Sequence, residues 1–233
     1  MKVAILAAFR KEVEDLARDV GAPLSGKETP PRRELVPFFR RSALFAGRQL
    51  LFAITGIGKV PAASCCQFVI DTFRPDLILH CGTAGALADG VSPLDMVVAE
   101  RTLAFDQGPA SPTWWETDGE RISGLLRAAR HASGNCGGGS VLRGGIVTGD
   151  RPVLAGADRR SLAARFDALA VDMEAAAVVQ TASVNGVSAL VLKAVTDRAD
   201  EGAEGDFKKN LEPAARLIRG AILRYVEKEA ALR

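Results

Sequence analysis

Two carboxylates stand at the start of a long uncharged segment in the C-terminal half of the chain. Asp172 and Glu174 flank Met173, and the helix expected over Met173 to Val184 carries no charge beyond Glu174. Acids are favoured in the first turn of a helix, so complementing the helix dipole is one explanation. An apolar helix is buried, however, and a carboxylate at its mouth needs a partner. Ribose hydroxyls are suitable donors, because one carboxylate can accept from two of them at once.

Two further acids follow other apolar runs. Glu12 comes shortly after the first run of the chain, and Asp197 comes directly after the last. Each has a plain structural explanation, since Glu12 could be a first-turn acid and Asp197 a cap of the next turn. His80 and His131 are too few and too far apart for a Ser/His/Asp triad or a metal site. The candidate reactive groups are therefore carboxylates, and we expect no metal and no cofactor.

Glycines follow two of the expected strands. Gly56-Ile57-Gly58-Lys59 resembles a phosphate loop but lacks its six-residue frame and the Ser or Thr after Lys, which argues against nucleoside triphosphates. Gly82-Thr83-Ala84-Gly85 has small side chains that would let a flat ligand approach the backbone. Tight packing of a helix on a strand would select the same residues, so this segment is compatible with both explanations.

Strand-like and helical patterns alternate along the chain. Strands are expected at Val3 to Ala7, Leu50 to Thr55, Asp76 to Cys81, Asp95 to Ala99, Val141 to Thr148 and Ser188 to Val195. Helices are expected at Lys11 to Val20, Val60 to Phe73, Glu120 to Ala132, Leu154 to Phe166, Met173 to Val184 and Phe207 to Ala231. Residues 22–41, rich in Pro and Arg, are expected to form a loop, and Ser133 to Ser140 a flexible connection.

This alternation predicts a three-layer α/β/α fold with a central mixed, mostly parallel sheet. In such sheets ligands bind outside the carboxyl ends of the strands. Four of those ends carry candidate residues: Arg10 to Glu12, Thr55 to Gly58, Gly82 to Gly85, and Thr196-Asp197. We expect these segments to surround one ligand.

The composition narrows the function classes. The 233 residues include 30 Lys and Arg against 28 Asp and Glu, a formal net charge of +2, which gives no reason to expect nucleic acid or an anionic membrane as partner. No apolar run reaches the length of a membrane span, and the apolar start is shorter than a signal-peptide core. Four cysteines without metal-ligand spacing are expected to be free thiols in a cytoplasmic protein. We expect residues 1–233 to form a single domain.

Six segments, taken together, carry a family resemblance. They are Met1 to Ala8 with Glu12; Thr55 to Val60; Pro75 to Ile78 with Gly82 to Gly85; Thr148 to Asp150; Val171 to Ala175; and Ala194 to Asp200. In this order and spacing they resemble the nucleoside phosphorylase superfamily, most closely its 5′-methylthioadenosine/S-adenosylhomocysteine nucleosidase branch. The resemblance covers nearly the whole chain. It implies a small-molecule nucleoside substrate and a homo-oligomer, with the dimer typical of nucleosidases.

The resemblance also implies roles. Asp197 matches the general acid at purine N7, Glu12 the residue that activates the attacking water, and Glu174 the ligand of the ribose hydroxyls. Met173 matches the side chain packed beneath the sugar. The other residues implied to bind substrate are Thr55, Thr83, Ala84, Gly85, Val153, Asp172 and Thr196. Breaking an N-glycosidic bond builds positive charge on the sugar and negative charge on the base, so an acid and a base are needed on opposite sides.

Three departures from the family pattern bear on the reaction. The nucleosidases have a base-stacking aromatic residue shortly after their Gly-Asp, where this chain has Arg151-Pro152-Val153. The acidic pair begins with Asp172 rather than Glu. Phosphorylases usually place an Arg before the Gly-Thr segment to bind phosphate, where this chain has His80-Cys81.

Hydrolysis of a purine nucleoside is the favoured hypothesis. The alternative is phosphorolysis, with Arg10 or the Arg40-Arg41 pair as the anion site. A third hypothesis is a nucleoside-binding protein without catalysis, but binding alone does not need Glu12. Two segments have two interpretations each: Trp114-Trp115 as a packed lid or a base-stacking platform, and Arg198 to Asp206 as a gate or an ordinary loop.

Overall fold

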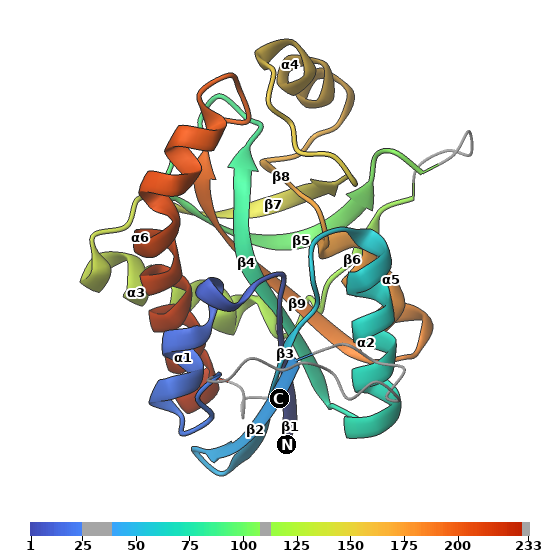
Figure 1. Ribbon diagram of the computed structural model, residues 1–233, viewed down its shortest axis with the longest axis vertical. Coiled ribbons are helices and arrows are strands. Elements are labelled where there is room, and N and C mark those ends of the chain that lie inside the picture. Colours follow the sequence, from blue (N-terminus) through green and yellow to red (C-terminus); the bar gives the residue numbers. More distant parts are fainter. Residues whose placement is uncertain (25–38, 108–112, 230–233) are drawn as a thin grey trace.

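Nine strands form one mixed sheet in the computed structural model, which describes residues 1–24, 39–107 and 113–229 (Figure 1). They are β1 (Lys2–Ala7), β2 (Phe39–Phe45), β3 (Arg48–Ile54), β4 (Leu77–Ala86), β5 (Met96–Ala104), β6 (Trp115–Glu116), β7 (Val141–Thr148), β8 (Ala170–Asp172) and β9 (Ser188–Asp197). The pairs β1–β3, β1–β4, β4–β9, β5–β7 and β7–β8 are parallel. The pairs β2–β3, β4–β8, β5–β6 and β5–β9 are antiparallel.

Five of the strands close into a circuit of pairings, in the order β4, β8, β7, β5, β9 and back to β4. The closure aligns the ends of several strands. Gly85 pairs with Asp197, after a bulge that follows Ala84, and Thr148 pairs with Asp172. Side chains at the ends of β4, β7, β8 and β9 are therefore brought to one edge, where the sequence predicts ligand binding.

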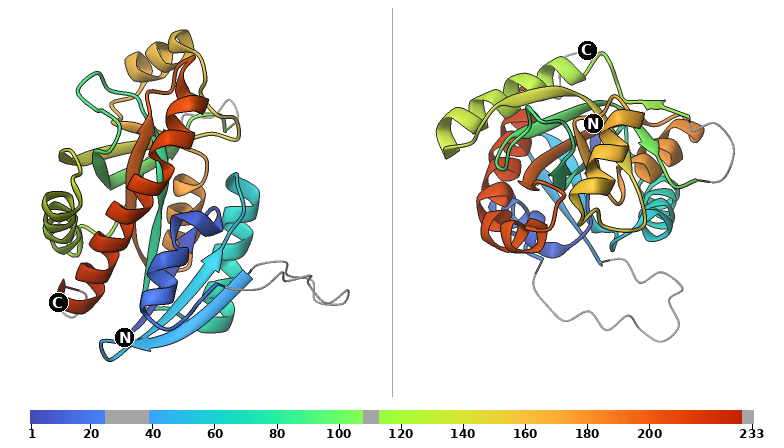
Figure 2. Two further views of the ribbon diagram at one scale, coloured as in Figure 1. Left: turned by 60° about the vertical axis from the view of Figure 1, so that its left-hand side comes forward. Right: turned by 90° about the horizontal axis from the view of Figure 1, so that it is seen from above.

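Helices cover both faces of the sheet (Figures 1 and 2). On one face lie α1 (Glu14–Asp19), α3 (Ile122–Cys136) and α6 (Ala203–Arg224), which continues into the π-helical η2 (Tyr225–Glu229). On the other face lie α2 (Lys59–Phe73) and α5 (Ala175–Val184). The remaining helix, α4 (Gly156–Arg165), lies at the top of Figure 1. This arrangement confirms the expected α/β/α fold class.

The alternation of side chains along β1 divides the core in two. Val3 and Ile5 pack with α1, α3 and α6, whereas Ala4 and Leu6 pack with α2 and α5. All four are fully buried, as expected for a strand covered on both faces. Within the described residues, no helix is long and apolar enough to cross a membrane.

Several boundaries differ from the predictions because tertiary pairing extends segments that look locally complete. The strand expected to end at Cys81 continues to Ala86, since its last residues pair with β9 and β8. The expected loop 22–41 was wrong at its end, where β2 begins at Phe39 against β3. Residues 25–38 lie outside the described part.

The predicted helices are displaced at their ends. The segment 10–20 divides into the 3-10 turn η1 (Arg10–Glu12) and α1. The expected flexible connection was wrong for residues 133–136, because α3 continues to Cys136 and ends in a left-handed Gly137. Met173 and Glu174 precede α5 instead of opening it, since β8 ends at Asp172. The last helix begins at Ala203, and its expected end beyond residue 229 lies outside the described part.

Candidate active site

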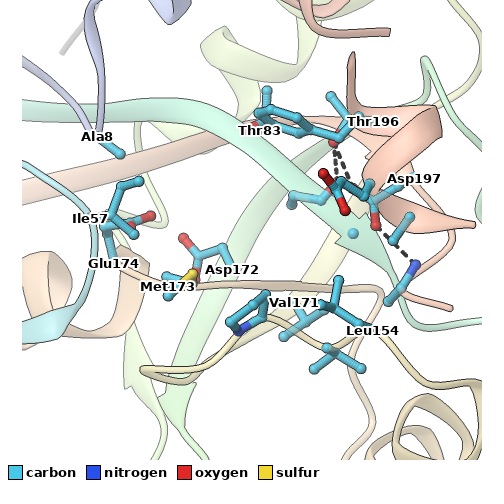
Figure 3. A pocket seen from close by; sticks show the side chains of 18 of the residues that line it. Ala8, Ile57, Thr83, Leu154, Val171, Asp172, Met173, Glu174, Thr196 and Asp197 are labelled. Carbon is cyan, nitrogen blue, oxygen red and sulfur yellow. Dashed lines mark hydrogen bonds between the residues drawn. The ribbon is translucent and has the colours of Figure 1, made fainter. Parts of the chain in front are cut away.

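A cavity of about 360 Å³ opens where the ends of the strands converge. It is lined by Glu12, Glu174 and Asp197, three acids that are far apart in the sequence. In Figure 3, Glu174 and Asp197 lie on opposite sides of the cavity. The other predicted site residues that line it are Met173, Thr83, Ala84, Gly85, Val153, Asp172 and Thr196.

Glu12 is held by hydrogen bonds on both carboxylate oxygens. The backbone N–H groups of Ala8 and Phe9 donate to Oε2 at 3.0 and 3.3 Å. The backbone N–H and the hydroxyl of Thr83 donate to Oε1 at 2.8 and 3.0 Å. A Cβ on Gly82 would lie 2.6 Å from Oε1, so glycine is required for this approach of β4. These contacts fix the carboxylate in one orientation.

Burial raises the pKa of Glu12, although Lys193 and the donated hydrogen bonds act in the opposite direction. A carboxylate with a raised pKa is a stronger base than one in water. Glu12 is therefore more than the ordinary first-turn acid that the sequence allows. It is a fixed, desolvated carboxylate that lines the cavity.

Asp197 is the last residue of β9. The hydroxyl of Thr196 donates to its Oδ2 at 2.8 Å, and the backbone N–H of Ala199 donates to its Oδ1 at 2.9 Å. A Cβ on Gly85 would lie 2.8 Å from Oδ1, so a second glycine of β4 makes room for a second acid. Burial raises the pKa of Asp197, with these two hydrogen bonds opposing. A raised pKa favours a protonated carboxyl group that can donate.

Glu174 immediately precedes α5 but does not cap it. Its Oε1 instead accepts the backbone N–H of Gly58 at 3.0 Å. The first amides of α5 are satisfied by Asp172, whose Oδ2 accepts from Ala175 at 2.9 Å, and by the Thr148 hydroxyl, which accepts from Ala176 at 3.0 Å. The structural explanation, an acid that complements the start of the helix, therefore holds for Asp172, which binds the first amide of α5, and Glu174 keeps an oxygen for other partners.

A buried lysine that the sequence did not predict as a site residue lies between Asp172 and Glu174. Lys193 is 1% exposed, and its ammonium lies 2.8 Å from Asp172 Oδ2 and 3.8 Å from Glu174 Oε2. Burial alone would lower the pKa of Lys193. The negative charges of Asp172, Glu174 and Glu12 have the larger, opposite effect, so the pKa is raised and the ammonium stays charged. The available signal was a lysine in the middle of the apolar strand Ser188–Asp197.

Three comparisons place this geometry among known proteins. The family model described as the phosphorylase superfamily matches residues 2–227. The chain belongs to the phosphorylase superfamily. Membership confirms both the resemblance found in the sequence and the expectation of an enzyme of the nucleosidase or nucleoside phosphorylase type.

Individual members of the superfamily are similar over almost their full length. A curated 5′-methylthioadenosine/S-adenosylhomocysteine nucleosidase from Bacillus licheniformis is 29% identical, covering 98% of this chain and 99% of its own. The nucleosidase of the same name from Neisseria meningitidis, solved with methylthio-immucillin-A, has a TM-score of 0.84 at 30% identity and covers 97% and 98%. The futalosine hydrolase of Helicobacter pylori has a TM-score of 0.83 at 25% identity and covers 98% of both chains.

His80, Asp172 and Glu174 each place one potential metal-ligand atom within 4.8 Å of the others. The charged ammonium of Lys193 already contacts Asp172 at 2.8 Å and would repel a cation there. Burial and Lys193 lower the pKa of His80 to about 4, so the imidazole is neutral. We assign the cluster to an internal ion pair.

Replacing Lys193 by Met is expected to destabilise the protein by about 3–5 kcal/mol, because Asp172 would be left as an unpaired buried charge. Urea unfolding followed by circular dichroism measures this free energy. Lys209→Met, which removes an exposed lysine of α6, is the matched control. A loss below about 1 kcal/mol, typical of a surface ion pair, would contradict the assignment.

One predicted site residue, Thr55, lies outside the cavity lining, and of the two interpretations of Trp114-Trp115 the base-stacking platform does not match the placement of Trp114. Thr55 is buried outside the cavity lining, and its hydroxyl donates to the backbone oxygens of Ala7 and Gly56 at 3.3 and 2.7 Å. Trp114 lies under the guanidinium of Arg101, 4.5 Å from the ring centroid, and does not line the cavity. Both side chains have partners in the surrounding structure, which a sequence pattern does not reveal.

Other lining residues were not predicted. Phe9 and Phe207 both line the cavity, and their rings meet edge-to-face with centroids 6.1 Å apart. Ile57, which lies in the predicted segment Thr55 to Gly58 but was not among the predicted binding residues, also lines it and is 60% exposed. Phe9 is the residue before the charged segment that opens η1, and an aromatic at a strand end is the signal that could have indicated it. Phe207 looks like an ordinary helix residue in the sequence.

Proposed function

We propose that the protein hydrolyses the N-glycosidic bond of a purine nucleoside, with 5′-thio-substituted adenine nucleosides as the substrate class. The observation that carries the proposal is the placement of Glu12, Glu174 and Asp197 around one cavity. The names of the similar proteins support the substrate class, because 5′-methylthioadenosine/S-adenosylhomocysteine nucleosidases match this chain over nearly its full length.

Asp197 is the acid at the base. As the bond to the sugar breaks, negative charge develops on the purine, and a proton or hydrogen bond at N7 makes the base a better leaving group. Burial, which raises the pKa of Asp197, supports this role by favouring the protonated form. The Thr196 hydroxyl and the Ala199 N–H hold the carboxyl group in place.

Glu12 is the base on the opposite side of the sugar. It accepts a proton from water as the water oxygen forms its bond to the anomeric carbon, and the departing base takes the bonding electrons. The arrangement corresponds to the two carboxyl groups of inverting glycosidases, which act on opposite faces of a sugar. The positive charge of the sugar is also stabilised by the ionised carboxylates nearby.

Glu174 binds the ribose hydroxyls, and Met173 packs beneath the ring. Glu174 needs a donor from the ligand because its contact with Lys193, at 3.8 Å, is long. The base would lie against Pro152, Val153 and Val171, which line the cavity in place of an aromatic residue. Dispersion contacts to these side chains replace ring stacking.

Hydrolysis is favoured over phosphorolysis by the charges of the lining. Arg151 is the one cationic residue among the described residues that line the cavity, against the acids Glu12, Asp172, Glu174, Asp197 and Glu204. Neither Arg10 nor the Arg40-Arg41 pair, the predicted anion sites, is part of the lining. Phosphate would therefore be repelled from the side of the sugar where Glu12 lies.

A nucleoside panel assayed with and without phosphate tests the proposal. We expect 5′-methylthioadenosine and S-adenosylhomocysteine to release adenine and a free sugar in phosphate-free buffer. A requirement for phosphate, with a sugar phosphate as product, would replace hydrolysis by phosphorolysis. Binding detected as a thermal shift, with no turnover over hours, would favour a protein that binds nucleosides without catalysis.

The pH dependence of kcat/KM should report Glu174. Burial, with added repulsion from Asp172 and Glu12, raises the pKa of Glu174 to about 7, against the effects of Lys193 and the Gly58 N–H. The ionised carboxylate can accept from two ribose hydroxyls, whereas protonation turns one of its oxygens into a donor, so kcat/KM is expected to fall as the pH drops through about 7. Glu174→Gln should lower kcat/KM and abolish this acidic limb, because the amide does not titrate. An acidic limb at the same pH in the variant would assign it to another group.

We also propose that the protein acts as a homodimer. The support is a set of exposed apolar residues beside the cavity and on the helices of one face: Ile57, Val60 and Val184, which are 60%, 74% and 68% exposed. Burial of such residues against a second copy is favourable. Light scattering after size-exclusion chromatography should give twice the chain mass of 24.6 kDa, and a monomer would refute this proposal.

A further inference from the structure

Two glycine-containing motifs of the sequence, Gly56 to Lys59 and Thr148 to Asp150, take no direct part in the proposed reaction, yet they meet in space. We propose that Lys59, together with Asp106 and Asp150, is a positioning residue that joins two walls of the cavity and directs the Gly58 N–H at Glu174. The inference rests on the proposed function, because it assumes that Glu174 binds the ribose.

The cluster is held by both side-chain and backbone contacts. Lys59 is the first residue of α2, and its side chain is 12% exposed. The ammonium forms ion pairs with Asp106 and with Asp150, the latter at 3.2 Å. The backbone N–H of Lys59 donates to Asp150 Oδ1 at 2.8 Å, and the backbone N–H of Asp150 donates to Asp106 Oδ2 at 2.8 Å. The three residues thus form a closed circuit of contacts, which we call the Lys59 clasp.

The clasp connects segments that are distant in the sequence. Asp106 follows β5, Asp150 follows β7, and Lys59 opens α2 after β3. The packing around it is close, because a Cβ on Gly149 would lie 2.2 Å from the ring of Phe105. A glycine before Asp150 is therefore needed for the chain to pass this ring. Most exposed ion pairs contribute little, but a largely buried lysine in a circuit with two acids is constrained in its geometry.

The clasp touches the site through neighbouring residues on both sides. Gly58, which precedes Lys59, donates its N–H to Glu174 at 3.0 Å. Its φ of 101° is a conformation that favours glycine, and a Cβ there would meet Asp150 Oδ1 at 3.3 Å. On the other side, Asp150 precedes residues 151–154, which line the cavity. Release of Lys59 would free both the donor to Glu174 and the wall proposed to contact the base.

The clasp predicts a defined kinetic change for Lys59→Met. With 5′-methylthioadenosine as substrate, KM is expected to rise about tenfold while kcat changes less, since groups around the bound ligand are misplaced but the acid and base remain. Lys59→Arg should restore most of the loss, because it keeps the charge. Arg216→Met, which breaks the exposed ion pair of Arg216 with Glu212 on α6, is the control.

A pH profile separates positioning from general stability. Loss of the Gly58 N–H would remove a hydrogen bond that lowers the pKa of Glu174, so the acidic limb of kcat/KM is expected to move to higher pH. The other titratable and charged groups that face Glu174 are unchanged between the wild type and Lys59→Met. They are Lys193 on β9, Asp172 on β8, Glu12 on η1 and His80 on β4. A change in melting temperature alone would not move this limb.

The acids of the clasp allow a second test that does not depend on the folding of Lys59→Met. Asp106→Asn and Asp150→Asn should each raise KM, and the double variant should raise it by less than the product of the two effects. Independent, multiplying effects would overturn the proposal, as would a wild-type KM in folded Lys59→Met. If the wild-type protein releases no base, the proposed function fails. The clasp is then tested by calorimetry, with the dissociation constant for 5′-methylthioadenosine compared between the wild type and the same variants.

Discussion

Replacing Asp197 by Asn is expected to reduce kcat for base release by about 10²–10⁴-fold, the usual contribution of a general acid. The amide keeps the size of the carboxyl group and can still accept the Ala199 N–H, but it has no acidic proton to give to the base. The variant should therefore fold normally and still bind the nucleoside. Steady-state release of adenine from 5′-methylthioadenosine measures the loss, and a nucleoside-induced thermal shift measures the retained binding.

The matched control is Asp167→Asn, which removes a carboxylate whose side chain is 99% exposed and which does not line the cavity. We expect its activity to equal that of the wild type. If Asp197→Asn kept activity within about tenfold of wild type, proton donation to the base would have to come from another group.

Replacing Glu12 by Gln is the second change with a large expected effect, again about 10²–10⁴-fold in kcat. The amide can accept hydrogen bonds at one atom only, and it cannot take a proton from water. Four donors now satisfy the two carboxylate oxygens, so the amide nitrogen would also face N–H groups and turn out of position. Adenine release measured across pH tests the loss of a base, because added alkali should recover part of the rate.

Two further variants test whether the position and orientation of Glu12 matter for activity. Glu14→Gln, two residues away and outside the cavity lining, should be close to wild type. Gly82→Ala keeps Glu12 but would place a Cβ 2.6 Å from its Oε1, so it should also lose most activity. Full activity in Gly82→Ala with an unchanged fold would show that the exact orientation of Glu12 is unimportant.

The convergence of Glu12 and Asp197 could be predicted from the sequence because each follows an expected strand, and the carboxyl ends of strands meet at one edge of a sheet. Glu174 follows no strand that the sequence indicates, and its place beside them was implied by the uncharged helix after it and by the family resemblance. The same rule located Gly82 and Gly85 but not their purpose. They are small because two acids, Glu12 and Asp197, lie against β4.

Other features depend on contacts that no local pattern carries. Lys193 occupies an apolar strand, and only the positions of Asp172 and Glu174 explain why a charge is tolerated there. The three-residue β8 is defined by its pairing with β4 and β7. Asp172 caps α5 and Glu174 does not. This difference likewise follows from the turn between β8 and α5.

A crystal structure with a non-hydrolysable C-nucleoside analogue of 5′-methylthioadenosine tests the roles of the three acids most directly. We expect the N7 edge of the base within hydrogen-bond distance of Asp197, the ribose hydroxyls on Glu174, and an ordered water between Glu12 and the anomeric carbon. A ligand bound outside this cavity, or one whose base lies at Glu12 and whose sugar lies at Asp197, would contradict these roles.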